Sequence, residues 1–248
     1  MSRISGKRAS EIEGTDKENI HQRATGILDI LKSEFSVPKL SNIADDPFKV
    51  LIRTVISQST AEANTRRAYE NLSKRMVITP RRLADADVKE IEEALRVAGL
   101  YRNKSRTIKK ISELMLEEYG GSLDFIYSTP LEEARERLME LPGVGPKTAD
   151  IVLLFCAERP TIAVDTHVNR VSKRLGLASA KADYEVVRRS VQELYRPKEY
   201  LSVHMLLIAL GRRYCKTLNP LCSICPVRQN CPSAEVYISR RTHSPESS

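Results

Sequence analysis

The sequence predicts an all-α protein, and three features of its 248 residues support this fold class. Apolar residues recur three and four positions apart along most of the chain, which is the period of an amphipathic helix. Alternating runs of β-branched residues, which are typical of strands, do not occur, and aromatic residues make up only 5% of the chain. No apolar run approaches the roughly eighteen residues of a membrane-spanning helix, so we expect no membrane partner.

The first helix is predicted over residues 18–35. Its apolar stripe consists of Ile20, Ala24, Ile27, Leu28, Leu31 and Phe35. Residues 1–17 have mixed charges and no apolar stretch, so we expect a flexible tail without a secretion signal. The last eight residues, 241–248, are expected to form a second flexible tail.

A second long amphipathic pattern covers residues 47–75, and Pro80 marks a new start. Three more helices are predicted over 88–98, 103–118 and 130–141. Gly99 is expected to end the first of these and Gly120-Gly121 the second, because glycine commonly follows the last helical turn.

The charge balance points to an acidic partner. Lysine and arginine exceed the acidic residues by eight, and the isoelectric point is about 9.3. Nucleic acid is the leading candidate for such a partner. From charge alone, a soluble protein that is basic but binds no nucleic acid remains an alternative.

Residues 141–148 read Leu-Pro-Gly-Val-Gly-Pro-Lys-Thr and separate two helical patterns. Gly143 and Gly145 permit a tight turn, and Pro146 suits the first position of the following helix. Such a turn presents backbone N–H groups beside a helix N-terminus, which is a natural seat for a phosphate. A plain corner between two helices is the competing interpretation.

Lys147 is predicted at the second position of that helix, and Asp165 lies in the string Ala-Val-Asp-Thr-His. The positive end of the helix dipole disfavours an ammonium ion, so a neutral amine able to form a Schiff base is favoured there. The simpler interpretations are a lysine that holds a phosphate and an aspartate that caps a helix.

Four of the five cysteines lie close together with the spacing Cys215-x6-Cys222-x2-Cys225-x5-Cys231. Four thiolates in one short loop fit either a tetrahedral zinc ion or a four-iron cluster. The single Cys-x2-Cys pair and the two Cys-Pro steps favour iron–sulfur over zinc. The fifth, Cys156, lies in an apolar run and is expected to be an inert thiol.

These motifs together resemble the endonuclease III family of helix–hairpin–helix DNA glycosylases. The string LPGVGPKTA, the separation of Lys147 from Asp165 and the 6, 2, 5 cysteine spacing carry the resemblance. It implies that Lys147 attacks the sugar C1′ carbon while Asp165 supports departure of the base, after which β-elimination cleaves the strand. It also implies a 4Fe–4S cluster on the four cysteines. Relatives that only remove a base lack this lysine.

The resemblance further implies residues that contact DNA. In the hairpin these are Gly143, Val144, Gly145 and Thr148. Leu100 is the candidate wedge that enters the duplex, Gln58 or Ser59 the candidate probe of the opposite base, and His167 a further contact. Lys104, on a basic helix after Leu100, is expected to face phosphate. For Leu100 a helix-end hydrophobic contact, and for Lys104 a solvated surface, are the competing interpretations.

The implied architecture has two helical lobes with a DNA cleft between them. One lobe is a six-helix barrel over 41–159 that contains the hairpin. The other combines 18–40 with 160–240 and carries the cluster. Lys147 and Asp165 are expected to face each other across the cleft.

The predicted function is removal of damaged, oxidised pyrimidines from double-stranded DNA, followed by strand cleavage at the abasic site. We expect a monomer in the bacterial or archaeal cytoplasm, or in the nucleus or mitochondrion of a eukaryote. Two alternatives remain: a related glycosylase with another base preference, such as mismatched thymine, and a non-catalytic DNA-binding module.

Overall fold

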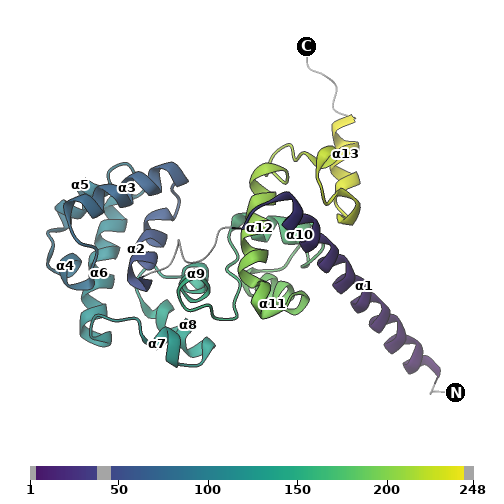
Figure 1. Ribbon diagram of the computed structural model, residues 1–248, viewed down its shortest axis with the longest axis horizontal. Helices are drawn as coiled ribbons and strands as arrows, with labels where there is room; N and C mark the ends of the chain where they lie inside the picture. Colours follow the sequence, from purple (N-terminus) through teal and green to yellow (C-terminus); the bar gives the residue numbers. More distant parts are fainter. Residues whose placement is uncertain (1–3, 38–45, 243–248) are drawn as a thin grey trace, which may run out of the picture. The chain divides into compact units, whose positions relative to one another are not determined.

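The computed structural model describes residues 4–37 and 46–242, and every regular element among them is a helix. The predicted all-α class is therefore confirmed. The chain divides into two compact units, one of residues 1–38 and 161–248 and the other of residues 39–160. Figure 1 labels the helices of both units. In the described part of the chain, no helix is both long enough and apolar enough to cross a membrane.

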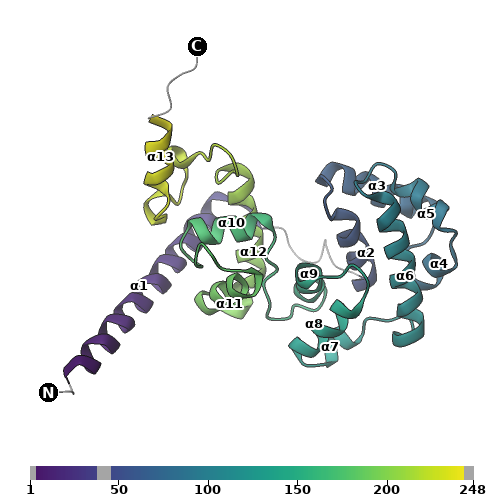
Figure 2. The ribbon, with the colours of Figure 1, turned by 180° about the vertical axis from the view of Figure 1, so that it is seen from behind.

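In its described residues, 46–160, the 39–160 unit is a cluster of eight helices around one apolar core. They are α2 (Pro47–Ser57), α3 (Glu62–Arg75), α4 (Pro80–Asp85), α5 (Val88–Leu95), α6 (Tyr101–Tyr119), α7 (Phe125–Ser128), α8 (Leu131–Glu140) and α9 (Pro146–Cys156). Helix α6 packs against α2, α4 and α5, as Figure 2 also shows from behind. Gly120 ends α6 with a positive φ of 59°, as predicted.

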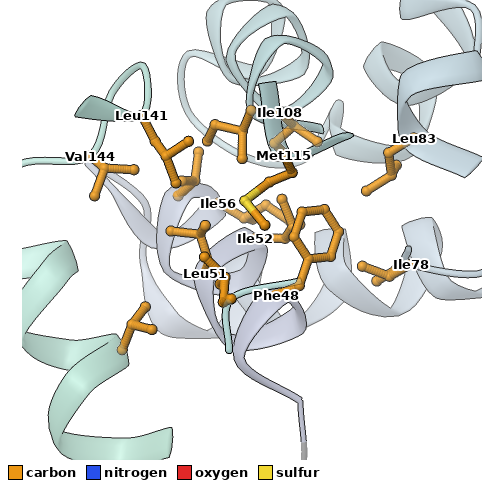
Figure 3. Close-up of a cluster of buried hydrophobic side chains, with 14 of the residues drawn as sticks. Phe48, Leu51, Ile52, Ile56, Ile78, Leu83, Ile108, Met115, Leu141 and Val144 are labelled. Atoms are coloured by element: carbon orange, nitrogen blue, oxygen red, sulfur yellow. The ribbon is translucent and has the colours of Figure 1, made fainter. Parts of the chain in front are cut away.

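The core of this unit joins the first helix to the hairpin. Figure 3 shows Ile52 and Ile56 of α2 beside Ile108 of α6, with Leu141 and Val144 of the hairpin at the same cluster. All five side chains are buried. Burial of a side chain of this size stabilises a fold by about 1.5–3 kcal/mol, so the hairpin is fixed to the helices behind it.

The predicted 47–75 pattern is two helices rather than one. Helix α2 ends at Ser57 and α3 begins at Glu62. Between them Ser59 has a positive φ of 50°, which a continuous helix does not allow. The large apolar residues of the first helix stop at Ile56, and the polar run Ser57-Gln58-Ser59-Thr60 lies at the break.

Gly99 has a different role from the predicted helix end. Helix α5 already ends at Leu95, and Leu100 rather than Gly99 takes the left-handed conformation, with φ 57°. A Cβ atom on Gly99 would lie 2.7 Å from the carbonyl oxygen of Ser59. Glycine is therefore required here by the close approach of two turns.

The other unit is also helical. Its elements are α1 (Ile4–Glu34), α10 (Thr166–Arg174), α11 (Tyr184–Leu194), α12 (Tyr200–Arg213) and α13 (Ala234–Thr242), with 3-10 turns η2 (Pro197–Glu199), η3 (Cys222–Ile224) and η4 (Arg228–Asn230). Helix α12 packs against α1 and α10. The predicted stripe of the first helix faces this core, where Ala24, Ile27, Leu28 and Leu31 are buried.

The predicted tails differ from the structure. Helix α1 begins at Ile4, so residues 4–17 are helical rather than a flexible tail. This stretch lacks proline, and extending a helix that packing has already nucleated is easier than starting one. At the other end, Arg241 and Thr242 belong to α13, and residues 243–248 lie outside the described part.

Candidate active site

The hairpin before α9 is held by its own backbone and by the core. The Val144 N–H donates to the Leu141 carbonyl at 3.1 Å, and Gly143 has φ 74°. A Cβ atom on Gly143 would lie 2.9 Å from Thr107 Cγ2, so both the conformation and the space require glycine. The Val144 side chain is only 5% exposed. The Val144 side chain thus anchors the hairpin, and a DNA contact at this position stays a prediction.

Helix α9 begins without a side-chain cap. Gly145 occupies the N-cap position and, having no side chain, supplies no cap hydrogen bond, while Pro146 is the first helical residue. The N–H groups of Gly145 and Lys147 have no hydrogen-bond partner among the described residues. Gly143 and Gly145 are both exposed. Free N–H donors at an exposed helix N-terminus form an anion-binding arrangement.

Gln58 connects the end of α2 to this hairpin. Its side-chain Nε2 donates to the Gly143 carbonyl at 3.0 Å and to Thr148 Oγ1 at 3.4 Å. Thr148 is only 3% exposed. The Thr148 hydroxyl accepts from Gln58 inside the unit, and a DNA contact by Thr148 stays a prediction. Ser59 is exposed, while the amide group of Gln58 is engaged with the hairpin.

Lys147 is the second residue of α9, as predicted, and is partly exposed. A buried ion pair lies behind it on the same helix. Asp150 is fully buried, and Arg135 of α8 donates to both of its carboxylate oxygens, at 3.0 and 3.3 Å. Sequence analysis missed this pair, because neither residue stands in a motif and the pairing depends on how α8 packs against α9.

Asp165 is the N-cap of α10, as predicted. Its Oδ1 accepts a hydrogen bond from the Val168 N–H at 2.7 Å. The preceding segment is anchored twice: the Val164 N–H donates to Tyr184 Oη at 3.2 Å, and His204 Nδ1 lies 2.8 Å from the Ala163 carbonyl. The carboxylate is thus held at a defined position beside an open depression lined in part by Asn169, Lys173 and Tyr184.

Lys147 belongs to the 39–160 unit and Asp165 to the other. The expectation that Lys147 and Asp165 face each other therefore stays a prediction.

His167 lies in the first turn of α10 against α12. Its Nδ1 accepts from Arg170 Nη2 at 3.1 Å, and a Cβ atom on Gly211 would lie 2.9 Å from Nδ1. Burial lowers the pKa of His167; the Asp165 carboxylate opposes this shift, and Arg170 is among the groups that add to it. The His167 Nδ1 atom is thus engaged within its own unit, and a DNA contact by His167 stays a prediction.

Lys104 corrects another prediction. It was expected to face phosphate, yet it is 4% exposed. Its Nζ donates to the Ile56 carbonyl at 2.7 Å and to Thr60 Oγ1 at 2.6 Å. Burial also lowers its pKa to about 8. Lys109, farther along α6, is partly exposed and donates to the carbonyls of Ala84 and Ala86. Leu100, by contrast, is 64% exposed.

The four clustered cysteines line one pocket of the 1–38 and 161–248 unit. Cys215, Cys222, Cys225 and Cys231 surround it together with apolar residues that include Leu175, Leu210 and Val227. In their present positions, no three His, Cys, Asp or Glu side chains of the described chain form a metal-coordinating group. The structure brings the four thiols to one place without giving a ligand geometry.

The donor chemistry of this pocket fits a metal cluster. Burial and, to a lesser extent, the neighbouring cysteines raise the pKa of the Cys225 thiol to about 11, although a backbone hydrogen bond at Val227 opposes the shift. Four thiolates are therefore difficult to hold together here unless a positively charged centre offsets their repulsion. By contrast, the lone Cys156 has a pKa raised by burial to about 12, as expected of an inert thiol.

Arginines from α1 and α10 form hydrogen bonds to the cysteine loop, residues 215–231, and to the turn after α10. Arg170 Nε donates to the Cys215 carbonyl at 2.9 Å, and Arg174 Nη1 lies 3.5 Å from Cys215 Sγ. Arg23 of α1 donates to the carbonyls of Gly176 and Asn230, each at 3.1 Å. Sequence analysis did not identify these arginines, because their partners are backbone carbonyls with no sequence signature.

A family model described as "HhH-GPD superfamily base excision DNA repair protein" matches residues 52–197. Endonuclease III of Thermotoga maritima is 37% identical to this chain over 186 residues, which cover 75% of the chain and 83% of the relative.

Among solved structures, a trapped endonuclease III–DNA covalent intermediate aligns with a TM-score of 0.78. The two chains are 32% identical, with 88% of this chain and 98% of the other covered. A thermostable thymine-DNA glycosylase aligns with a TM-score of 0.74 over 89% and 99% of the two chains. At 18% identity the second likeness concerns the fold alone.

Proposed function

Because this chain belongs to the endonuclease III family of the HhH-GPD superfamily of base excision DNA repair proteins, we propose that it removes oxidised pyrimidines from duplex DNA and then cleaves the strand. It is a base-excision-repair DNA glycosylase, and the proposal concerns its lesion, its catalytic residues and its cofactor. The observation that carries the proposal is Lys147 at the uncapped start of α9, directly after an exposed hairpin.

Lys147 supplies the nucleophile in this proposal. Its amine forms a bond to C1′ of the damaged nucleotide while the bond from C1′ to the base breaks, and the base leaves with the electron pair and takes up a proton. The nitrogen lone pair then forms a double bond to C1′ while the bond from C1′ to the ring oxygen O4′ breaks and O4′ takes up a proton, which gives a protonated Schiff base. Loss of a proton from C2′ then expels the 3′ phosphate, and water releases the lysine.

Asp165 supports the first of these steps. Positive charge develops on the sugar as the base departs, and a carboxylate held close to C1′ stabilises that charge. The cap hydrogen bond from Val168 fixes one oxygen of the carboxylate, and Oδ2 has no hydrogen-bond partner among the described residues.

The hairpin supplies the phosphate seat. The free N–H groups of Gly145 and Lys147 and the exposed turn at Gly143 suit a DNA backbone, which such contacts position without reading its sequence. The net charge of +8 favours association with DNA in general. Binding therefore weakens steeply as salt increases, because each phosphate contact releases counterions.

The endonuclease III family generally contains an iron–sulfur centre, and we propose that Cys215, Cys222, Cys225 and Cys231 hold a 4Fe–4S cluster. When bound, such a cluster joins the four thiolates into one fixed loop. Purified protein should be yellow-brown and carry about four iron atoms per chain. A colourless protein with one zinc ion per chain would refute this assignment.

A panel of duplex oligonucleotides tests the function directly. We expect excision and strand cleavage at oxidised pyrimidines and much slower excision of thymine from G·T mismatches. Borohydride should trap a covalent adduct on abasic DNA with the natural protein and none with Lys147→Ala. Binding without excision or trapping would leave only a non-catalytic DNA-binding module. Preferred excision from G·T mismatches would change the substrate class.

A further inference from the structure

Three exposed non-glycine residues of the 39–160 unit, Ser59, Leu100 and Glu158, have a left-handed backbone, and the first two lie in turns that touch each other. Ser59 has φ 50° and Leu100 has φ 57°, and both side chains are exposed. Residues with a side chain rarely adopt this conformation, and it persists only where the surroundings enforce it. Neither side chain can supply that enforcement, because both extend outward.

The turns that carry these residues touch each other. The Gly99 N–H donates to Thr60 Oγ1 at 3.2 Å, and a Cβ atom on Gly99 would lie 2.7 Å from the Ser59 carbonyl oxygen. The Thr60 hydroxyl itself donates to the Gln58 carbonyl at 3.2 Å. The hydroxyl therefore bonds to the backbone on both sides of the contact.

Lys104 completes this junction. Its buried Nζ donates to Thr60 Oγ1 and to the carbonyl of Ile56 in the last turn of α2. Carbonyls of a last helical turn lack partners within the helix, and a cation there also interacts favourably with the dipole. With Lys104 and Gly99 as donors and Gln58 as acceptor, the hydroxyl of Thr60 uses its full hydrogen-bonding capacity.

We infer that Lys104 is a positioning residue. Through Thr60 it holds the two turns together, so that the exposed side chains of Ser59 and Leu100 are fixed relative to each other. The inference rests on the proposed function, in which residues of these two turns enter the duplex when the damaged nucleotide leaves it. Holding both turns in place beforehand removes the need to order them during base extrusion. Lys104 therefore acts on the step that extrudes the base and not on the bond-forming step at Lys147.

The same helix offers a matched control. Lys109 is partly exposed, donates to two backbone carbonyls, those of Ala84 and Ala86, and lies 3.5 Å from the Glu113 carboxylate. Lys109→Met thus removes a comparable set of hydrogen bonds from α6 without touching either turn. Thr60→Val removes only the bridging hydroxyl, and Thr60→Ser keeps it.

The activity test compares two substrates in single-turnover experiments. Lys104→Met and Thr60→Val should slow excision of an oxidised pyrimidine about tenfold to a hundredfold, while borohydride trapping on abasic DNA, where the base is already gone, falls less than about threefold. Lys109→Met and Thr60→Ser should resemble the natural protein on both substrates. Equal losses on both substrates, or the same excision loss in Lys109→Met, would overturn the inference.

Hydrogen exchange of the free protein tests the junction without DNA. Amides of residues 57–61 and 98–102 should exchange faster together in Lys104→Met and Thr60→Val, and not in Lys109→Met. Faster exchange in only one segment, or in neither, contradicts the inference even if the enzyme is active. If instead the exchange pattern is as expected but the natural protein neither excises nor traps, the proposed function fails and the junction stands.

Discussion

Helices α9 and α10 carry the two proposed catalytic residues in their first turns, but their N-termini differ. The start of α9 is open: Gly145 offers no side chain to cap it, and the Lys147 N–H has no hydrogen-bond partner within the described residues. The start of α10 is closed, because the Asp165 carboxylate accepts a hydrogen bond from Val168. The anchors also differ: a buried ion pair holds α9 from within, whereas neutral hydrogen bonds hold the segment before α10.

This difference suits the two proposed roles. An open helix start keeps its donors for an external phosphate, while a closed start uses them to fix its own carboxylate. A helix N-terminus can therefore either bind an anion of the DNA or hold a carboxylate that acts on the DNA.

The largest expected effect is at the closed start. Asparagine caps a helix about as well as aspartate, so Asp165→Asn should keep α10 while removing the charge. Excision should fall about 100-fold to 10,000-fold, the usual range for loss of a group that acts on proton transfer or developing charge. The free energy of unfolding should change by less than about 0.5 kcal/mol.

Asp165→Ala provides the control, because it removes the charge and the cap together. It should lose about 1 kcal/mol of stability in urea unfolding in addition to the activity. Full excision by Asp165→Asn would show that capping is the only role of Asp165.

The two anchors should differ in strength. Asp150→Asn breaks a buried, bidentate ion pair and removes the buried charge that faces Arg135, whereas Glu132, 3.9 Å from Arg135, is exposed; the loss should be about 3–5 kcal/mol. Tyr184→Phe removes one neutral hydrogen bond near Asp165 and should cost about 1 kcal/mol. Urea unfolding followed by circular dichroism measures both. Equal losses would mean that the two helix starts are held with similar strength.

The open start can be closed by substitution. Gly145 has φ −97° and open space around its Cα atom, so Gly145→Asp should cap α9 and stabilise it by a few tenths of a kcal/mol. The new carboxylate would occupy the phosphate seat, and DNA affinity should fall about tenfold, or about 1.4 kcal/mol. Gly145→Asn separates the cap from the charge and should bind DNA with intermediate affinity. Unchanged binding by Gly145→Asp would place the phosphate elsewhere.

The smallest effect concerns the C-terminal end of α2. Burial lowers the pKa of Lys104 to about 8 from an ordinary value of 10.5. Between these values the unfolded chain binds more protons than the folded one, so the contribution of Lys104 to stability rises with pH over that window and is lost as pH falls through 8. Lys104→Met should therefore abolish a stability increase between pH 8 and pH 10. The same increase in the variant would assign it to another group.

Most of the confirmed predictions about helix ends rest on short local sequence patterns. Pro146, Gly120 and the cap at Asp165 depend on a few neighbouring residues, and the structure has each of them as predicted. Lys104 could not be read in this way, because a lysine in a basic run has the same local pattern whether it faces solvent or the end of another helix.

The same limit applies to α2 and α3, and to Arg135. The break at Ser59 is enforced by contacts from Gly99 and Lys104, some forty residues later in the chain. The Arg135–Asp150 pair likewise requires that α8 and α9 pack together. The all-α fold class could thus be predicted from the sequence. The contacts that hold the candidate site in place could not, because they depend on tertiary packing.

The nucleophile can be located directly by mapping the reduced protein–DNA adduct. After borohydride trapping on abasic DNA, the protein is digested and the modified peptide is sequenced by mass spectrometry. The account predicts a single modification on Lys147 of the peptide that begins α9. A modification on the N-terminal amine or on another lysine, with Lys147 unmodified, would contradict it.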